Sequence, residues 1–209
     1  IDLFKYFLRK KINNVNNFFF KNGVGDKFDL KKDFITVMQY PVTTEYGENY
    51  KNMLEVLNAV SKIDCPKLIF WPNPDAGSDE IALAIREYRE KKLIKNSWFI
   101  KNLTHELFTY VLNNTKCLVG NTSSAIREGS YIGVPSVSVG TRQNGRQRSK
   151  NIINSKPNAD EIYKKIIKQM KMNKKSFKNK MYGDGFASRR IVKILENVNV
   201  DIQKRLFYK

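Results

Sequence analysis

A run of small polar residues, Asn121-Thr122-Ser123-Ser124, follows an apolar stretch of the chain and precedes a helical pattern. Hydroxyls and free backbone N–H groups at the start of a helix favour an anion, and a diphosphate is a natural guest. The same residues would serve equally well as ordinary helix caps. Glu128, one turn further along, is placed either to accept hydrogen bonds from ribose hydroxyls or to pair with Arg127 at the surface.

Three arginines, Arg142, Arg146 and Arg148, form a second candidate anion site. The planar guanidinium fork suits phosphate oxygens, although the spacing alone fits a flexible, exposed basic loop equally well. Asn73 and Asp75 follow another apolar run, where their residue types fit either a ligand site or an Asx turn.

The elements that must position these residues alternate along the chain. Short apolar runs alternate with helical patterns, which is typical of βαβ units around a parallel sheet. The predicted strands span 34–39, 67–71, 98–101, 117–120 and 136–140, with a brief extended piece at 152–153. The predicted helices span 49–62, 78–92, 105–114, 123–133, 159–172 and 187–197. Ser78 and Thr104 are the expected N-caps of the second and third of these helices.

The pattern predicts the α/β fold class, with a Rossmann-like parallel sheet and flanking helices. Ligands bind such sheets beyond the carboxyl ends of the strands. Polar clusters follow the first, second, fourth and fifth predicted strands, at 39–45, 72–78, 121–124 and 141–146. The sequence therefore predicts that these clusters share one site at one edge of the sheet.

The chain is strongly basic, with a formal net charge of +18 over 209 residues. Such a balance indicates nucleic acid, an anionic membrane surface or a phosphorylated substrate as partner. The excess is spread widely, and its densest stretch, 164–180, mixes lysines with apolar residues as a solvated helix face does. No run is long and apolar enough to span a membrane. Nucleic acid and membrane are therefore not the expected partners.

Metal and disulfide chemistry find little support in the composition. The chain has two cysteines, Cys65 and Cys117, in apolar surroundings, and one histidine, His105. This set is too small for a zinc site and fits two buried free thiols in a reducing cytoplasm. We expect a cytoplasmic protein without cofactor or metal, since arginines and helix N-termini can meet the charge of a diphosphate.

At these clusters the sequence resembles the hydrolysing UDP-N-acetylglucosamine 2-epimerases, including those that supply sialic acid synthesis. The matching stretches are QYPVTTEYGEN (39–49), FWPNPDAGSDE (70–80), LVGNTSSAIREGSYIGVPSVSVGTRQNGR (118–146) and MYGDGFASRRI (181–191). The third is long and specific, and the resemblance covers about residues 30 to 205.

The resemblance implies one half of a two-domain GT-B-type fold, with the active site in the cleft between the domains. Residues 1–30, whose pattern indicates a helical lead-in followed by a loop around 22–25, would be an interdomain lead-in. Residues 31–209 would be the C-terminal nucleotide-sugar-binding domain, with the N-terminal domain absent. The last helix would cross back over that other domain. Dimers are common in the resembled family, and the sequence leaves the oligomeric state open.

The family reaction eliminates UDP across the C1–C2 bond of the sugar and then adds water, which releases UDP and N-acetylmannosamine. Such a reaction needs a base near C2 and stabilisation of the departing diphosphate. Carboxylates of the first domain are implicated in the proton chemistry, while the second domain mainly holds UDP. By position, the residues expected at the nucleotide are Asn73, Asp75, Asn121, Thr122, Ser123, Ser124, Glu128 and Arg142.

One departure from the family pattern concerns catalysis. The family usually has histidine where this chain has Tyr40, and that histidine is implicated in the chemistry. Tyrosine can donate a hydrogen bond to an oxyanion, but its pKa near 10 keeps it neutral. The alternatives are therefore a catalytically silent sugar-nucleotide-binding module or a related glycosyltransferase. The sequence does not decide between UDP and GDP, nor does it define the acyl or deoxy substituents of the sugar.

Overall fold

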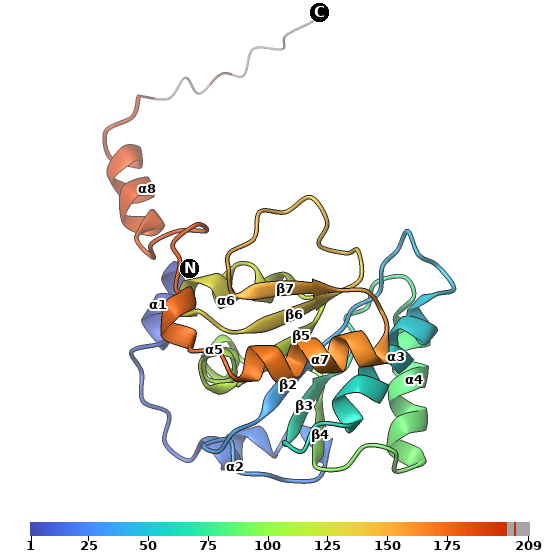
Figure 1. The fold of residues 1–209 in the computed structure, drawn as a ribbon. Helices are drawn as coiled ribbons and strands as arrows, with labels where there is room; N and C mark the ends of the chain where they lie inside the picture. The colour runs from blue at the N-terminus through green and yellow to red at the C-terminus, as the bar shows by residue number, and fades with distance from the viewer. Residues whose placement is uncertain (200–202, 204–209) are drawn as a thin grey trace, which may run out of the picture.

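The computed structural model describes residues 1–199 and 203, and it shows a seven-stranded sheet between two layers of helices (Figure 1). The strands lie in the order β1-β4-β3-β2-β5-β6-β7. All neighbouring pairs are parallel except β1, which pairs antiparallel with β4 at the edge. The strands are β1 (Gly23–Gly25), β2 (Ile35–Met38), β3 (Lys67–Phe70), β4 (Ser97–Ile100), β5 (Cys117–Gly120), β6 (Ser136–Val139) and β7 (Ile152–Ser155).

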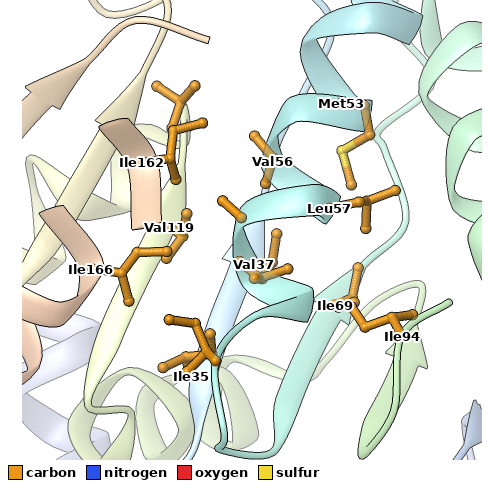
Figure 2. Packing of buried hydrophobic residues seen from close by; sticks show 14 of the residues in the cluster. Ile35, Val37, Met53, Val56, Leu57, Ile69, Ile94, Val119, Ile162 and Ile166 are labelled. Atoms are coloured by element: carbon orange, nitrogen blue, oxygen red, sulfur yellow. The ribbon is translucent and has the colours of Figure 1, made fainter. Parts of the chain in front are cut away.

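Helices α3 (Asn49–Ser61), α4 (Ser78–Glu90) and α7 (Ala159–Met170) cover one face of the sheet. Figure 2 shows the core beneath them, where Val56 and Leu57 of α3 and Ile162 and Ile166 of α7 meet Val37 and Val119 of the sheet. The central strands β2 to β6 are buried along their whole length, as expected for parallel strands covered on both faces.

The opposite face is covered by α1 (Asp2–Phe7), α2 (Val15–Phe19), α5 (His105–Asn114) and α6 (Glu128–Ile132). Phe4, Phe19 and Leu30 are buried in this second core. The predicted helical lead-in therefore packs on the sheet as part of the same body. The last helix, α8 (Ala187–Leu195), extends away from the sheet with none of its residues buried (Figure 1).

Two predicted elements differ from the structure. The expected loop at 22–25 is strand β1, because Gly23 lets the chain approach Trp98 so closely that a Cβ there would lie 2.4 Å from the indole Nε1. The expected helix 123–133 is a short 3-10 turn, Ser123–Ala125, followed by the separate helix α6. A side-chain amide from outside, Asn151 Nδ2, donates to the Ala125 carbonyl (3.0 Å) that a continuous helix would use.

The remaining helices and strands agree with the prediction to within two residues at most ends. Thr104 caps α5 as expected, since its hydroxyl accepts from the Leu107 N–H at 3.3 Å. Ser78, however, is the first residue of α4 and not its cap. The N-cap is Gly77, which has no side chain to offer.

Candidate functional site

The sheet reverses its winding between β2 and β5. From β2 the chain winds outward through β3 to β4, then crosses back to β5 and winds the other way to β7. Loops that leave the carboxyl ends of two such strands diverge and open a crevice, where α/β sheets bind their ligands. In this chain the crevice lies between the segments that begin at Tyr40 and Asn121.

Asn121 joins the two sides of the crevice. Its side-chain amide donates to the Tyr40 carbonyl and its Oδ1 accepts from the Tyr40 N–H, both at 2.7 Å. The Asn121 carbonyl in turn accepts from Gln143 Nε2 at 2.7 Å. Asn121 is 1% exposed, and both polar ends of its amide are already engaged. The structure therefore shows Asn121 as a residue that orders the loops after β2, β5 and β6.

The polar run continues as a tight turn. The Thr122 hydroxyl accepts from the Ser124 N–H at 3.2 Å, as a capping residue does. Ser123 and Ser124 are half-buried, and in the part of the chain that the structure describes no hydrogen bond engages either hydroxyl. Since the 3-10 turn has only three residues, hydroxyls and local N–H groups are what this turn offers an anion, rather than the dipole of a long helix.

Arg142 connects all four loops of the site. Its guanidinium lies 3.6 Å from the Asp75 carboxylate, 3.5 Å from the Asn121 carbonyl, and 5.4 Å from the centre of the Tyr40 ring. Asn73 completes the group, since its Nδ2 donates to the same Asp75 oxygen. Five predicted site residues from the ends of β2, β3, β5 and β6 are thus brought into one cluster of contacts.

The aromatic ring beneath Arg142 belongs to Tyr40, and ionisation of the Tyr40 hydroxyl is strongly disfavoured. Burial raises the pKa of the Tyr40 hydroxyl to about 12, while the positive charge of Arg142 lowers it by a smaller amount. The hydroxyl therefore keeps its proton throughout the neutral range. It can donate a hydrogen bond to an oxygen that gains negative charge, but it cannot serve as a general base there.

A cavity of about 980 Å³ opens beside this cluster. Tyr40, Asn73 and Glu128 line it together with an apolar wall from Phe7, Phe70, Trp71 and Phe108. Its volume lies in the upper part of the range of small-molecule sites, about 300–1,000 Å³. Glu128 begins α6, and its carboxylate lies 3.6 Å from Arg127, as expected for the surface pair, while the residue also lines the cavity.

The other arginines of the basic loop are arranged differently from Arg142. Arg148 turns inward, where its guanidinium donates to the Gln143 carbonyl at 2.7 Å and to Asn154. Arg146 is exposed. Tyr182 donates to the Gln147 carbonyl at 2.7 Å and so ties the Tyr182-Gly183-Asp184-Gly185 segment to this loop.

Several buried amides that shape the site carry no signal in the sequence. Asn49, which is 2% exposed, accepts from the Val42 N–H at 2.8 Å and donates to the Glu45 carbonyl, and so it folds the loop after β2. Gln143 and Asn151 play the same part for the loops after β5 and α6. The partners of Gln143 and Asn151 are backbone groups 17 to 26 residues away in the chain, which spacing cannot reveal.

Within residues 1–199 and 203, no group of three or more His, Cys, Asp or Glu side chains is placed to hold a metal ion. No helix in this described part is long and apolar enough to cross a membrane. Both cysteines are buried and unpaired in the structure.

Comparison with solved structures places this architecture among known folds. A UDP-N-acetylglucosamine 2-epimerase from Methanocaldococcus jannaschii, solved in complex with UDP-GlcNAc and UDP, aligns with a TM-score of 0.67 at 16% identity. The alignment covers 93% of this chain and 53% of that one. The enzyme from Neisseria meningitidis bound to UDP-GlcNAc aligns with a TM-score of 0.61 at 15% identity. This likeness confirms the predicted Rossmann-like half of a GT-B-type fold.

Curated relatives are similar in sequence as well. The UDP-N-acetylglucosamine 2-epimerase of Neisseria meningitidis serogroup B is 30% identical over 80% of this chain and 45% of its own length. The GDP/UDP-N,N'-diacetylbacillosamine 2-epimerase (hydrolyzing) of Campylobacter jejuni is 32% identical over 88% of this chain and 49% of its own. This chain therefore spans about half the length of these relatives. The sequence model of the UDP-N-acetylglucosamine 2-epimerase family matches residues 4–196, and the chain belongs to that family.

Proposed function

We propose that this chain is the UDP-binding half of a hydrolysing UDP-N-acetylglucosamine 2-epimerase. The complete enzyme would convert UDP-GlcNAc and water to UDP and N-acetylmannosamine, for sialic or other nonulosonic acid synthesis in the cytoplasm. The observation that carries the proposal is the Arg142 cluster, which joins the ends of β2, β3, β5 and β6 beside one cavity. The hydrolysing relatives from Campylobacter jejuni and Legionella pneumophila support this mode of reaction.

Different residues would contact different parts of the nucleotide. Arg142 and the free hydroxyls of Ser123 and Ser124 would hold the diphosphate, with Thr122 shaping their turn. Glu128 at the cavity wall would accept from the ribose hydroxyls. Asn73 and Asp75 would lie near the nucleotide and act on it through their contacts with Arg142. Asn121 would act by holding the loops in place.

Tyr40 would contribute a hydrogen bond rather than a proton transfer. When UDP departs, negative charge develops on the diphosphate, and a neutral donor beside Arg142 stabilises that charge. The base that removes the C2 proton would come from the other half of the enzyme. We also propose that this other half docks on α8, whose Ile191, Ile194 and Leu195 are each more than half exposed.

Calorimetric titration of the chain with UDP, with GDP as the control nucleotide, tests the binding half of the proposal. We expect saturable binding that prefers UDP and is lost in the Ser123→Ala/Glu128→Ala double variant. Unchanged affinity in that variant would show that these two residues do not form the site.

A second candidate is a catalytically silent sugar-nucleotide-binding module, and Tyr40 is the observation that favours it. Turnover of UDP-GlcNAc distinguishes the epimerase from the silent module. It is measured by NMR after the other half of the enzyme is supplied as a separate chain. Free N-acetylmannosamine is expected from the epimerase. A silent module would leave the substrate intact, and a glycosyltransferase would transfer the sugar to an acceptor and release UDP without free N-acetylmannosamine.

A further inference from the structure

The Asp75–Arg142 ion pair lies at the centre of the proposed diphosphate site. The two side chains are 3.6 Å apart, with 42% of the Asp75 side chain and 28% of the Arg142 side chain exposed. Asn73 donates to the same Asp75 oxygen and so holds the carboxylate toward the guanidinium. Among the described residues, Asp75 is the one carboxylate within 4 Å of Arg142.

The other contacts of Arg142 hold it in place without neutralising its charge. Its Nη1 approaches the Asn121 carbonyl at 3.5 Å, and its guanidinium lies over the Tyr40 ring at 5.4 Å. A carbonyl and an aromatic face both attract a cation, but neither carries a full negative charge. The guanidinium therefore stays in the crevice whether or not Asp75 remains beside it.

A diphosphate that binds Arg142 needs the same N–H groups that Asp75 now faces. Two anions close to one guanidinium repel each other, so the carboxylate and the diphosphate compete for it. Asp75 is the more exposed partner and can turn toward water, whereas Arg142 is held by contacts from two other loops. Exchange of the carboxylate for the diphosphate is the outcome that this geometry favours.

We propose, on the basis of the function proposed above, that Asp75 is a positioning residue that occupies Arg142 in the empty site and is displaced by the diphosphate of the nucleotide. Asp75 thus acts on the ligand through Arg142 and makes no contact with the nucleoside. Any ligand that reaches Arg142 must break the ion pair, while a ligand that does not reach it leaves the pair intact. Asp75 thereby lowers the affinity for diphosphates and not for nucleosides.

Calorimetry with three probes, UDP, inorganic pyrophosphate and uridine, tests this proposal. Asp75→Asn keeps the shape of the side chain and removes its charge. We expect it to bind UDP and pyrophosphate about two- to fivefold more tightly than the parent chain, which is the range for a partly exposed ion pair. Uridine affinity should not change. In an Arg142→Gln background, Asp75→Asn should have no effect on any probe.

Asp64→Asn is the matched control, because it removes the same charge from an exposed aspartate beside the amino end of β3. It should leave all three affinities unchanged. Weaker binding of both uridine and UDP by Asp75→Asn would overturn the proposal and indicate direct contact between Asp75 and the nucleoside. Equal tightening in the Arg142→Gln background would overturn it too, as would failure of pyrophosphate to bind. Tightened pyrophosphate binding without any UDP binding would instead refute the proposed function and leave this inference standing.

Discussion

At the scale of single residues, Tyr40 differs most from what the family resemblance implies. The structure places its ring beneath Arg142 and at the edge of the cavity. Burial raises the pKa of its hydroxyl to about 12, so the residue is a neutral hydrogen-bond donor at every physiological pH. A histidine in this place could instead become cationic at acidic pH, with its pKa lowered by the burial and by Arg142.

The Tyr40→His variant should therefore acquire a pH dependence that the parent chain lacks. Burial and the charge of Arg142 both disfavour the imidazolium, so it forms only well below about pH 6.5, and UDP affinity should then rise about threefold relative to the parent. Titrations of parent, Tyr40→His and Tyr40→Phe at pH 5.5, 6.5 and 7.5 measure this difference. The titration of free UDP is common to the three experiments and cancels. Parallel curves for the parent and Tyr40→His would contradict the placement of Tyr40 beside the bound anion.

Asn121 is the residue whose loss should most affect the loops of the site. Asn121→Ala removes two buried hydrogen bonds to the backbone of Tyr40, and we expect unfolding to become easier by about 1–3 kcal/mol. Urea denaturation followed by circular dichroism measures this change. Ser124→Ala is the control, because its hydroxyl makes no hydrogen bond within the described part of the chain. Equal stability of the two variants would argue against the bridging role of Asn121.

At the scale of elements, the end of β5 depends on a close approach of two strands. Gly120 has φ of +125°, and a Cβ there would lie 2.2 Å from the Met38 carbonyl oxygen of β2. This approach sets the spacing of β2 and β5 at the point where the crevice opens.

Gly120→Ala should consequently destabilise the chain more than a glycine substitution that changes the backbone conformation alone. Gly140, at the end of β6, provides the matched comparison, because it has φ of +77° and nothing within 4 Å of an added Cβ. We expect Gly140→Ala to cost about 1–2 kcal/mol through backbone strain and Gly120→Ala to cost clearly more. Thermal unfolding measures both. Equal losses would show that β2 can move away from β5 without penalty.

The sequence predicted the elements well wherever local pattern and tertiary structure agree. Buried runs such as 117–120 can only be strands in this context, and the polar residues after them had to meet at one edge of the sheet. The same reasoning missed β1, because glycines that signal a loop serve here to approach Trp98. It also joined 123–133 into one helix, because the bond from Asn151 to Ala125 links residues 26 positions apart.

The sequence indicated which residues would come together in the candidate site, but not which contacts they would make. Residue types after each strand indicated Asn73, Asp75, Asn121 and Arg142. Arg142 contacts the Tyr40 ring, and the Asn121 amide forms hydrogen bonds with backbone groups. Both contacts depend on distances between loops that no local pattern encodes. The final part of the expected domain, 200–202 and 204–209, lies outside the described residues.

At the scale of the whole molecule, α8 is the element least explained by this chain alone. Ser188 near its start donates to the Asp2 carboxylate through both N–H and hydroxyl at 2.7 Å, so the helix begins beside the first residues of the chain. Beyond this anchor, Ile191, Ile194 and Leu195 are 54%, 62% and 67% exposed. An exposed apolar helix face of this kind is the surface on which we propose that the other half docks.

Ile194→Asp should accordingly leave this chain as stable as before, within about 0.5 kcal/mol, because the residue packs against little in the structure. It should weaken binding of the separately produced other half by tenfold or more, since a charge would enter an apolar contact. Calorimetric or sedimentation measurements of the two-chain complex test this, with Lys193→Gln as the control. Undiminished association of the Ile194→Asp chain would place the docking surface elsewhere.

The two tryptophans of the chain occupy separate environments, which gives the protein two intrinsic optical reporters. Trp71 lines the cavity with the Arg89 guanidinium 5.9 Å from its ring, whereas Trp98 is 3% exposed and packs edge-on against Phe20 beside β1. A ligand in the cavity changes the surroundings of the first indole and leaves those of the second intact. Fluorescence of a Trp71→Phe chain thus follows unfolding alone, while that of a Trp98→Phe chain follows occupancy of the cavity.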